Sequence, residues 1–169
     1  MKLVKLIAVI TVIAAACNKA EDNSSLNSSD NLFAQQVTYS NLAEIVEGGI
    51  AVANGNLDSV KMFGDMMITD HSQAQSELDS IATHLNIQLP STPDSAHQAM
   101  ATHLQALSGD EFDTTYIDAQ VTDHMNIIPF FNDEVAYGNS QELIAYANKY
   151  LPVMQAHLRE AQRIREMLH

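Results

Sequence analysis

The chain has one cysteine, Cys17, among 169 residues. A single cysteine cannot form an intramolecular disulfide. No glycine-rich phosphate-binding loop and no Gly-x-Ser-x-Gly motif occur, so the sequence offers neither a P-loop nor a hydrolase nucleophile elbow. No run of alternating polar and apolar residues competes with the helical periodicity, and no β-strand is therefore expected. These absences leave an all-α protein as the predicted fold class.

The first 16 residues have the features of a secretion signal. Lys2 and Lys5 precede an almost wholly apolar stretch, residues 6–16, which is too short to span a bilayer. Small residues then lead into Cys17, an arrangement that resembles a bacterial lipobox, in which the cysteine is acylated and becomes the first residue of the mature chain. The alternative is an ordinary signal peptide with an incidental cysteine. The lipobox interpretation predicts a lipid anchor at Cys17, with the membrane as its partner, and it leaves no free thiol for catalysis.

The segment after the cysteine is rich in Asn, Ser and Asp. We interpret residues 17–31 as the lipidated cysteine and a solvated tether, followed by one folded domain over residues 32–169. Asn18, rather than Asp, follows the cysteine, and residues 19–22 resemble a charged export signal of surface lipoproteins. Both features predict a cell-envelope protein anchored in the outer membrane, on its periplasmic or surface face.

Basic side chains are scarce. Lys and Arg number 8 against 21 Asp and Glu, which gives a formal net charge of −13. Removing a signal peptide with its two lysines would make this charge −15. Because phosphate contacts need cationic patches, no nucleic-acid partner is expected. An acidic domain attracts cations, although the same charge also serves solubility.

The folded part shows helical periodicity almost throughout. Apolar residues recur at intervals of three and four in five segments, predicted as helices over residues 32–54, 57–86, 94–107, 110–137 and 140–168. Four long helices with short connections predict a four-helix bundle, and the short helix lies in the connection between the second and third long helices. In the first helix the expected inner stripe is Leu42, Ile45, Gly49 and Val52. Pro129 and Pro152 are expected to kink or interrupt their helices.

A nine-residue pattern occurs twice, at residues 63–71 and 116–124. Each copy reads aromatic-x-Asp-x-x-aliphatic-Thr-Asp-His and ends in Asp70-His71 or Asp123-His124. The pattern places two histidines, each preceded by an acid, at what the alignment suggests are equivalent points of two helices.

Three histidines fall on the inner stripes of three different helices: His71, His124 and His157. Imidazole suits zinc, copper, nickel or iron, so their convergence predicts a transition-metal site in the bundle. Glu44 of the first helix lies beside that helix's expected stripe and is a further candidate ligand. The alternative is a buried network of histidines and acids that is satisfied without a metal and fixes the helix register.

Asp70 and Asp123 lie about 100° around the helix from their histidines. Each could accept the second ring N–H of a ligating histidine or bind the metal directly. Met67 and Met154 lie one turn before His71 and His157, where they either act as soft ligands for copper or fill gaps in the core.

Catalysis has less support in the residues. Diiron oxidase bundles carry Glu-x-x-His pairs and several inward carboxylates, and no such pair lies on the expected inner faces. A metalloenzyme is therefore the third interpretation, after a metal-binding protein and a metal-free structural or interaction protein.

Several stretches resemble the bacterial family called domain of unknown function 4142, or DUF4142. They include Met67-Ile-Thr-Asp-His71, Val121-Thr-Asp-His124, Leu151-Pro-Val-Met-Gln-Ala-His157 and, longest, Leu104-Gln-Ala-Leu-Ser-Gly-Asp-Glu-Phe-Asp-Thr-Thr-Tyr-Ile117. The resemblance implies a ferritin-like bundle in an outer-membrane or periplasmic protein, and it matches Glu44, Asp70, His71, Asp123, His124 and His157 to recurring polar positions. Pro129 departs from the family pattern. The resemblance implies no settled activity, and a ferritin-like fold does not itself indicate ferroxidase chemistry.

Overall fold

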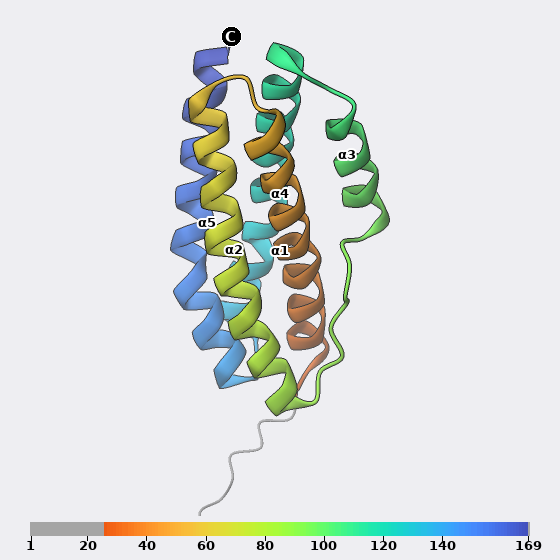
Figure 1. Ribbon diagram of the computed structural model, residues 1–169. Coiled ribbons are helices and arrows are strands. Elements are labelled where there is room, and N and C mark those ends of the chain that lie inside the picture. The colour runs from red at the N-terminus through yellow and green to blue at the C-terminus, as the bar shows by residue number, and fades with distance from the viewer. Residues whose placement is uncertain (1–25, 169) are drawn as a thin grey trace, which may run out of the picture.

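The computed structural model describes residues 26–168, which form five α-helices (Figure 1). These are α1 (Ser28–Asn54), α2 (Asp58–Leu85), α3 (Ser95–Gln105), α4 (Gly109–Tyr137) and α5 (Gln141–Leu168). The predicted all-α bundle with a short helix before its third long helix is confirmed. The predicted signal peptide, Cys17 and the first part of the predicted tether lie outside the described residues.

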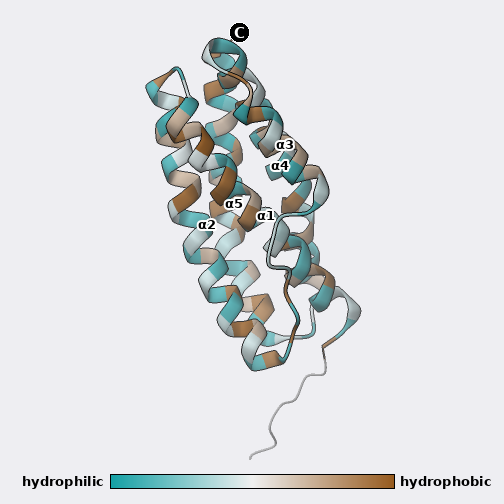
Figure 2. Cartoon of the chain, turned by 45° about the vertical axis from the view of Figure 1, so that its right-hand side comes forward, coloured by the Kyte–Doolittle hydropathy of each residue, from teal (hydrophilic) through white to brown (hydrophobic). Residues whose placement is uncertain are grey.

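The four long helices form two antiparallel hairpins, α1–α2 and α4–α5, packed side by side (Figure 1). The connection after α2 runs back along α1 to α3, which lies outside the bundle against α1 and α4. Hydrophilic and hydrophobic residues are interspersed along the helices (Figure 2). Within residues 26–168 no helix is both long and apolar enough to span a bilayer.

The first helix begins earlier than the sequence suggested. Its predicted start is residue 32, whereas α1 begins at Ser28. Asn27 caps the helix by accepting the backbone N–H of Asp30 at 2.8 Å, and the Asp30 carboxylate accepts the backbone N–H of Asn27 at 2.7 Å. This reciprocal capping box satisfies two backbone donors that the first turn would otherwise leave free.

A buried aspartate near the start of each hairpin holds the loop of the other hairpin. Asp30 Oδ1 accepts the backbone N–H groups of Asn139 and Ser140 at 2.8 and 3.1 Å. Asp113 accepts those of Asn56 and Leu57 at 2.8 and 2.9 Å. Both bundle ends are therefore fastened by charge-assisted hydrogen bonds between hairpins.

The two aspartates, Asp30 and Asp113, belong to an internal sequence repeat with an offset of 83 residues. Asp30 matches Asp113, and residues 52–56 and 135–139 share the sequence Val-Ala-x-Gly-Asn. The repeat relates α1 to α4 and α2 to α5. It differs from the alignment of His71 with His124, which joins the second helix of one hairpin to the first helix of the other. The two histidines are therefore not at equivalent points of the repeated hairpins.

A polar layer crosses the bundle and separates two apolar halves. One half is built around Phe33, Leu78 and Phe131, and the other around Phe63, Phe112 and Ile117. Between them the long helices bury polar side chains, each at most 8% exposed: Asn41, Glu44, Glu47, His71, Gln75, Gln120, His124 and His157. Buried polar groups cost free energy unless they are hydrogen-bonded. Hydrophobic burial in the two apolar halves must therefore offset the free-energy cost of any polar group that the layer leaves without a hydrogen bond.

The predicted inner stripe of the first helix is wrong in register. Gly49 is exposed, and Val52 is 36% exposed. The buried face instead passes through Val37, Asn41, Glu44, Gly48 and Ala51. Hydrophobicity could not identify this face because two of its central positions are polar.

The helices continue through both prolines. Pro129 lies within α4 and Pro152 within α5, and neither divides its helix into two elements. Each proline lacks the N–H that would bond the carbonyl four residues earlier, so one backbone acceptor in each helix loses its usual partner.

The backbones of α1 and α2 touch where two glycines cross. A Cβ on Gly64 would lie 2.7 Å from the carbonyl oxygen of Gly48, and the reverse substitution gives the same distance. We expect Gly64→Ala to lower the free energy of unfolding by about 1–3 kcal/mol, since one helix must move away from the other. Gly49→Ala is the matched control, because its Cβ meets nothing within 4 Å. This control should be stabilising by about 0.5–1 kcal/mol. Urea unfolding of both variants measures the difference, and equal effects would contradict the crossing.

Candidate metal centre

Three histidine rings from three helices meet in the polar layer. His71 comes from α2, His124 from α4 and His157 from α5, and none is more than 2% exposed. Their ring centroids lie 5.3–5.8 Å apart. One ring nitrogen of each lies within 4.8 Å of the other two, a grouping that can hold a metal ion. Whether the three nitrogens can bind depends on where the ring protons are.

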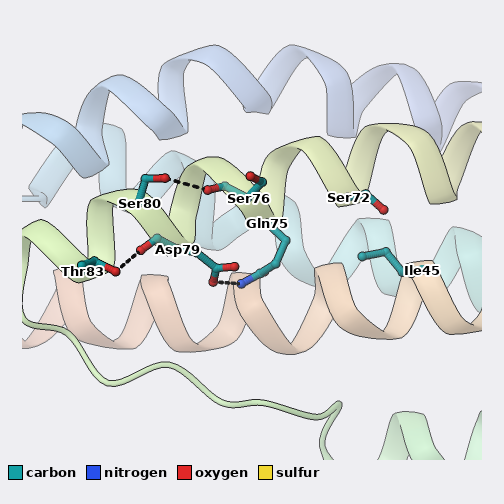
Figure 3. Close-up of a pocket in the computed structure, with 7 residues that line it drawn as sticks. All are labelled: Ile45, Ser72, Gln75, Ser76, Asp79, Ser80 and Thr83. Atoms are coloured by element: carbon teal, nitrogen blue, oxygen red, sulfur yellow. Dashed lines mark hydrogen bonds between the residues drawn. The ribbon is translucent and has the colours of Figure 1, made fainter.

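The proton on His71 is placed by a chain of hydrogen bonds that ends at the surface. Gln75 Nε2 donates to the Asp79 carboxylate at 2.7 Å, as Figure 3 shows. A carboxylate accepts only, so Gln75 turns its oxygen toward Asn41 Nδ2, which donates to it at 3.1 Å. The Asn41 oxygen then lies 2.9 Å from His71 Nδ1 and must accept from it. The lone pair of His71 is therefore on Nε2, which has no hydrogen-bond partner among the described residues.

His124 is oriented by its own helix. Its Nδ1 lies 2.9 Å from the main-chain oxygen of Gln120, one turn earlier. A carbonyl oxygen can only accept, so Nδ1 carries the proton. Nε2 then has the lone pair, and it is directed toward His157.

His157 is oriented by a neighbouring helix. Its Nε2 lies 3.0 Å from Asp70 Oδ2, on α2. The carboxylate accepts from Nε2, so the lone pair of His157 lies on Nδ1. That Nδ1 is 3.3 Å from Nε2 of His124. With these tautomers two acceptors face each other, and neither can donate to the other.

With these tautomers the ring nitrogens that carry a lone pair are Nε2 of His71, Nε2 of His124 and Nδ1 of His157, and one ring nitrogen of each histidine lies within 4.8 Å of the other two. Tetrahedral coordination at Zn–N distances near 2.0–2.1 Å places ligand nitrogens about 3.3 Å apart. The separation between His124 Nε2 and His157 Nδ1 matches this value. Each outer nitrogen donates to an oxygen, as metal-bound histidines do.

Burial keeps the cluster neutral. Desolvation, together with the neighbouring histidines, lowers the pKa of His71 well below its ordinary value and that of His124 to about 4. Desolvation also lowers the pKa of His157, against the opposing effect of Asp70. Neutral imidazole is the form that binds a metal, so protons do not compete for these nitrogens near pH 7.

The other predicted site residues lie in different places. Asp70 is bonded to His157, as a supporting carboxylate would be. Glu44 Oε1 lies 3.8 Å from Nδ1 of His124, which is the nitrogen directed away from the cluster. Asp123 is near the surface, where its Oδ1 lies 3.9 Å from Nε2 of His97 on α3.

The two methionines of the prediction, Met67 and Met154, are both buried in the apolar halves. The predicted site residues did not include four members of the polar layer: Asn41, Glu47, Gln75 and Gln120. Their signal in the sequence is weak, because a polar residue on a helix is ordinarily exposed. Asn41 could have been found through the 83-residue repeat, where it occupies the position of His124.

Comparison with protein families places the chain in the DUF4142 family, a domain of unknown function whose pattern matches residues 15–164. The chain belongs to this family. Its fold is similar to that of the crystal structure of a DUF305 fragment from Deinococcus radiodurans, with a TM-score of 0.74. The similarity covers 84% of this chain and 98% of that one at 7% sequence identity, which shows a shared fold only. Comparison with curated proteins gives no match.

Proposed function

We propose that this DUF4142 protein binds one transition-metal ion through Nε2 of His71, Nε2 of His124 and Nδ1 of His157. The observation that carries the proposal is the direction of the lone pairs. Hydrogen bonds to Asn41, to the Gln120 carbonyl and to Asp70 fix all three tautomers, so that three acceptors converge without a donor between them. A cation relieves the repulsion among these lone pairs.

The donor set favours borderline metals. Three neutral imidazoles suit zinc, copper or iron, whereas magnesium and calcium prefer oxygen ligands. The three nitrogens come from three different helices, so a bound ion links α2, α4 and α5. Such an ion stabilises the folded bundle over the unfolded chain.

For the setting of this site we propose the cell envelope. The lipobox-like segment ending at Cys17 and the polar residues after it support a lipid-anchored protein in the outer membrane. A membrane-anchored domain that holds a transition metal would buffer that metal or limit metal stress in the envelope.

Metal analysis of the purified protein tests the site. We expect near-stoichiometric zinc, copper or iron after exposure to the metal and removal of excess, and a loss of at least tenfold in retained metal for H71A/H157A. The matched control is H84A/H103A, which removes two exposed histidines and should retain the metal. Circular dichroism checks that each variant remains helical. Equal metal content in the wild type and H71A/H157A would contradict the proposal and favour a metal-free polar network.

A further inference from the structure

A second group of buried polar atoms lies on the opposite side of the His124 ring. It consists of Glu44 and Glu47 from α1 and Tyr116 and Gln120 from α4, each at most 1% exposed. Glu44 is beside Nδ1 of His124, whereas the three-histidine cluster is formed at Nε2. The two groups are therefore separated by one imidazole ring. We call the second group the carboxylate cluster.

The carboxylate cluster leaves several buried oxygens without a hydrogen-bond partner within residues 26–168. Gln120 Nε2 donates to Glu47 Oε2 at 3.4 Å. Four other oxygens have no hydrogen-bond partner among the described residues: Glu44 Oε2, Glu47 Oε1, Gln120 Oε1 and the Tyr116 hydroxyl. Native proteins leave few buried polar atoms unpaired, and four in one place call for an explanation.

The members of the cluster affect one another electrostatically. Desolvation first, and then the charges of Glu44 and Glu47, raise the pKa of Tyr116 well above its ordinary value. Desolvation raises the pKa of Glu47 to about 8, with a further contribution from Asp123. No Lys or Arg side chain is buried in the described part of the chain. No cationic side chain thus neutralises the carboxyl pair.

The charge of one residue in a surface cleft acts on the carboxylate cluster. Asp123, whose charge acts on both Glu44 and Glu47, lines a cleft between α3 and α4. His97 of α3 lines the same cleft and faces Asp123. Asp123 therefore links this cleft electrostatically to the buried carboxyl pair.

We propose that Glu44, Glu47 and the side-chain oxygen of Gln120 form a second cation site, which takes a hard divalent ion of the Mn²⁺, Mg²⁺ or Ca²⁺ class. Carboxylate and amide oxygens are the ligands that these ions prefer, and two carboxylates neutralise one divalent charge. The Tyr116 hydroxyl, which is buried and has no hydrogen-bond partner among the described residues, is the further oxygen that we assign to this site. This site uses none of the three ligand nitrogens and does not depend on the transition-metal proposal.

Binding of Mn²⁺ measured by electron paramagnetic resonance tests the second site. The free ion gives a six-line signal that weakens on binding. The experiment uses H71A/H157A protein, in which two ligand nitrogens are removed while His124 remains beside Glu44. We expect one Mn²⁺ to bind, with affinity falling at least tenfold when Glu47→Gln is added. Glu44→Gln should give a similar loss.

The matched control is Glu111→Gln, which removes one exposed acid from α4 and should leave Mn²⁺ affinity within twofold. Glutamine keeps the shape of glutamate, and the cooperativity of thermal unfolding checks that each variant is folded. No Mn²⁺ binding, or equal affinity with and without Glu47→Gln, would overturn the second site. Either result would leave the three-histidine site untouched, whose own test uses zinc, copper or iron.

Discussion

Saturating the protein with Zn²⁺ is expected to raise its thermal midpoint by about 8–16 °C, and H71A/H157A should show almost none of this rise. A ligand that binds only the folded state stabilises it by about 4 kcal/mol at a free concentration 1,000 times its dissociation constant. For a domain of this size each kcal/mol moves the midpoint by about 2–4 °C. The three nitrogens belong to α2, α4 and α5, so the unfolded chain has no preformed site.

Differential scanning calorimetry of protein first stripped with a chelator measures this rise, with the dissociation constant determined beforehand by competition. H84A/H103A should respond as the wild type does, since both substituted side chains are exposed. A rise of the same size in H71A/H157A would locate the stabilising zinc elsewhere on this acidic chain. A chelator added to the zinc-loaded wild type should restore the lower midpoint.

The sequence is informative where a helix interior is mostly apolar. On α5 the apolar residues Leu143, Tyr150 and Ile164 are buried, and His157 lies on the same face. One histidine among apolar positions leaves the period intact, so its inward direction could be predicted. The same holds for His71 on α2, between Met67 and Ala74.

The first helix shows the limit of this reasoning. Its outward face carries Val46 at 43% exposure, while Asn41, Glu44 and Glu47 point inward. Hydrophobic periodicity assigns polar residues to solvent. The predicted buried face of the first helix was therefore rotated about the helix axis from the observed one. The partners of the inward polar residues lie on α2, α4 and α5, which are distant in sequence.

The ring tautomers could not be obtained from the sequence for a related reason. The proton on His71 depends on an amide orientation in Asn41, which depends on Gln75 and finally on Asp79 at the surface. The sequence predicted that an aspartate accepts the second ring N–H of two of the histidines. In the structure the three acceptors are the Asn41 amide oxygen, the Gln120 main-chain carbonyl and the Asp70 carboxylate. Spacing along a helix identifies a shared face, but not which atom of which neighbour completes a hydrogen bond.

Metal-free protein is expected to lose stability between pH 6.5 and 8, and Glu134→Gln should remove about 1–2 kcal/mol of that loss. Glu134 is buried near the end of α4. Desolvation, together with the adjacent Asp30, raises its pKa from 4.5 to about 8. Between these two values the folded state keeps a proton that the unfolded chain has released. The free energy of unfolding therefore falls as the pH rises toward 8.

Glu47, whose pKa is also raised to about 8, acts in the same direction. Below pH 6.5 the buried histidines act oppositely, because the unfolded chain binds protons that His124, with a pKa of about 4, does not. Their contribution to stability is complete above pH 6.5 and is lost as the pH falls toward 4. Between about pH 4.5 and 6.5 the glutamates and the histidines change the free energy of unfolding in opposite directions. The loss of stability above pH 6.5 therefore reports on the carboxyl groups alone.

Urea unfolding at pH 6.5 and pH 8, in the presence of a chelator, measures the decline. Glutamine mimics the protonated carboxyl group and cannot ionise, so Glu134→Gln should be less sensitive to pH than the wild type. Glu111→Gln removes an exposed acid from the same helix and should decline as the wild type does. A wild type equally stable at both pH values would mean that Glu134 and Glu47 are ionised in the folded protein. That result would contradict the inference that these two buried carboxyl groups are protonated in the folded protein.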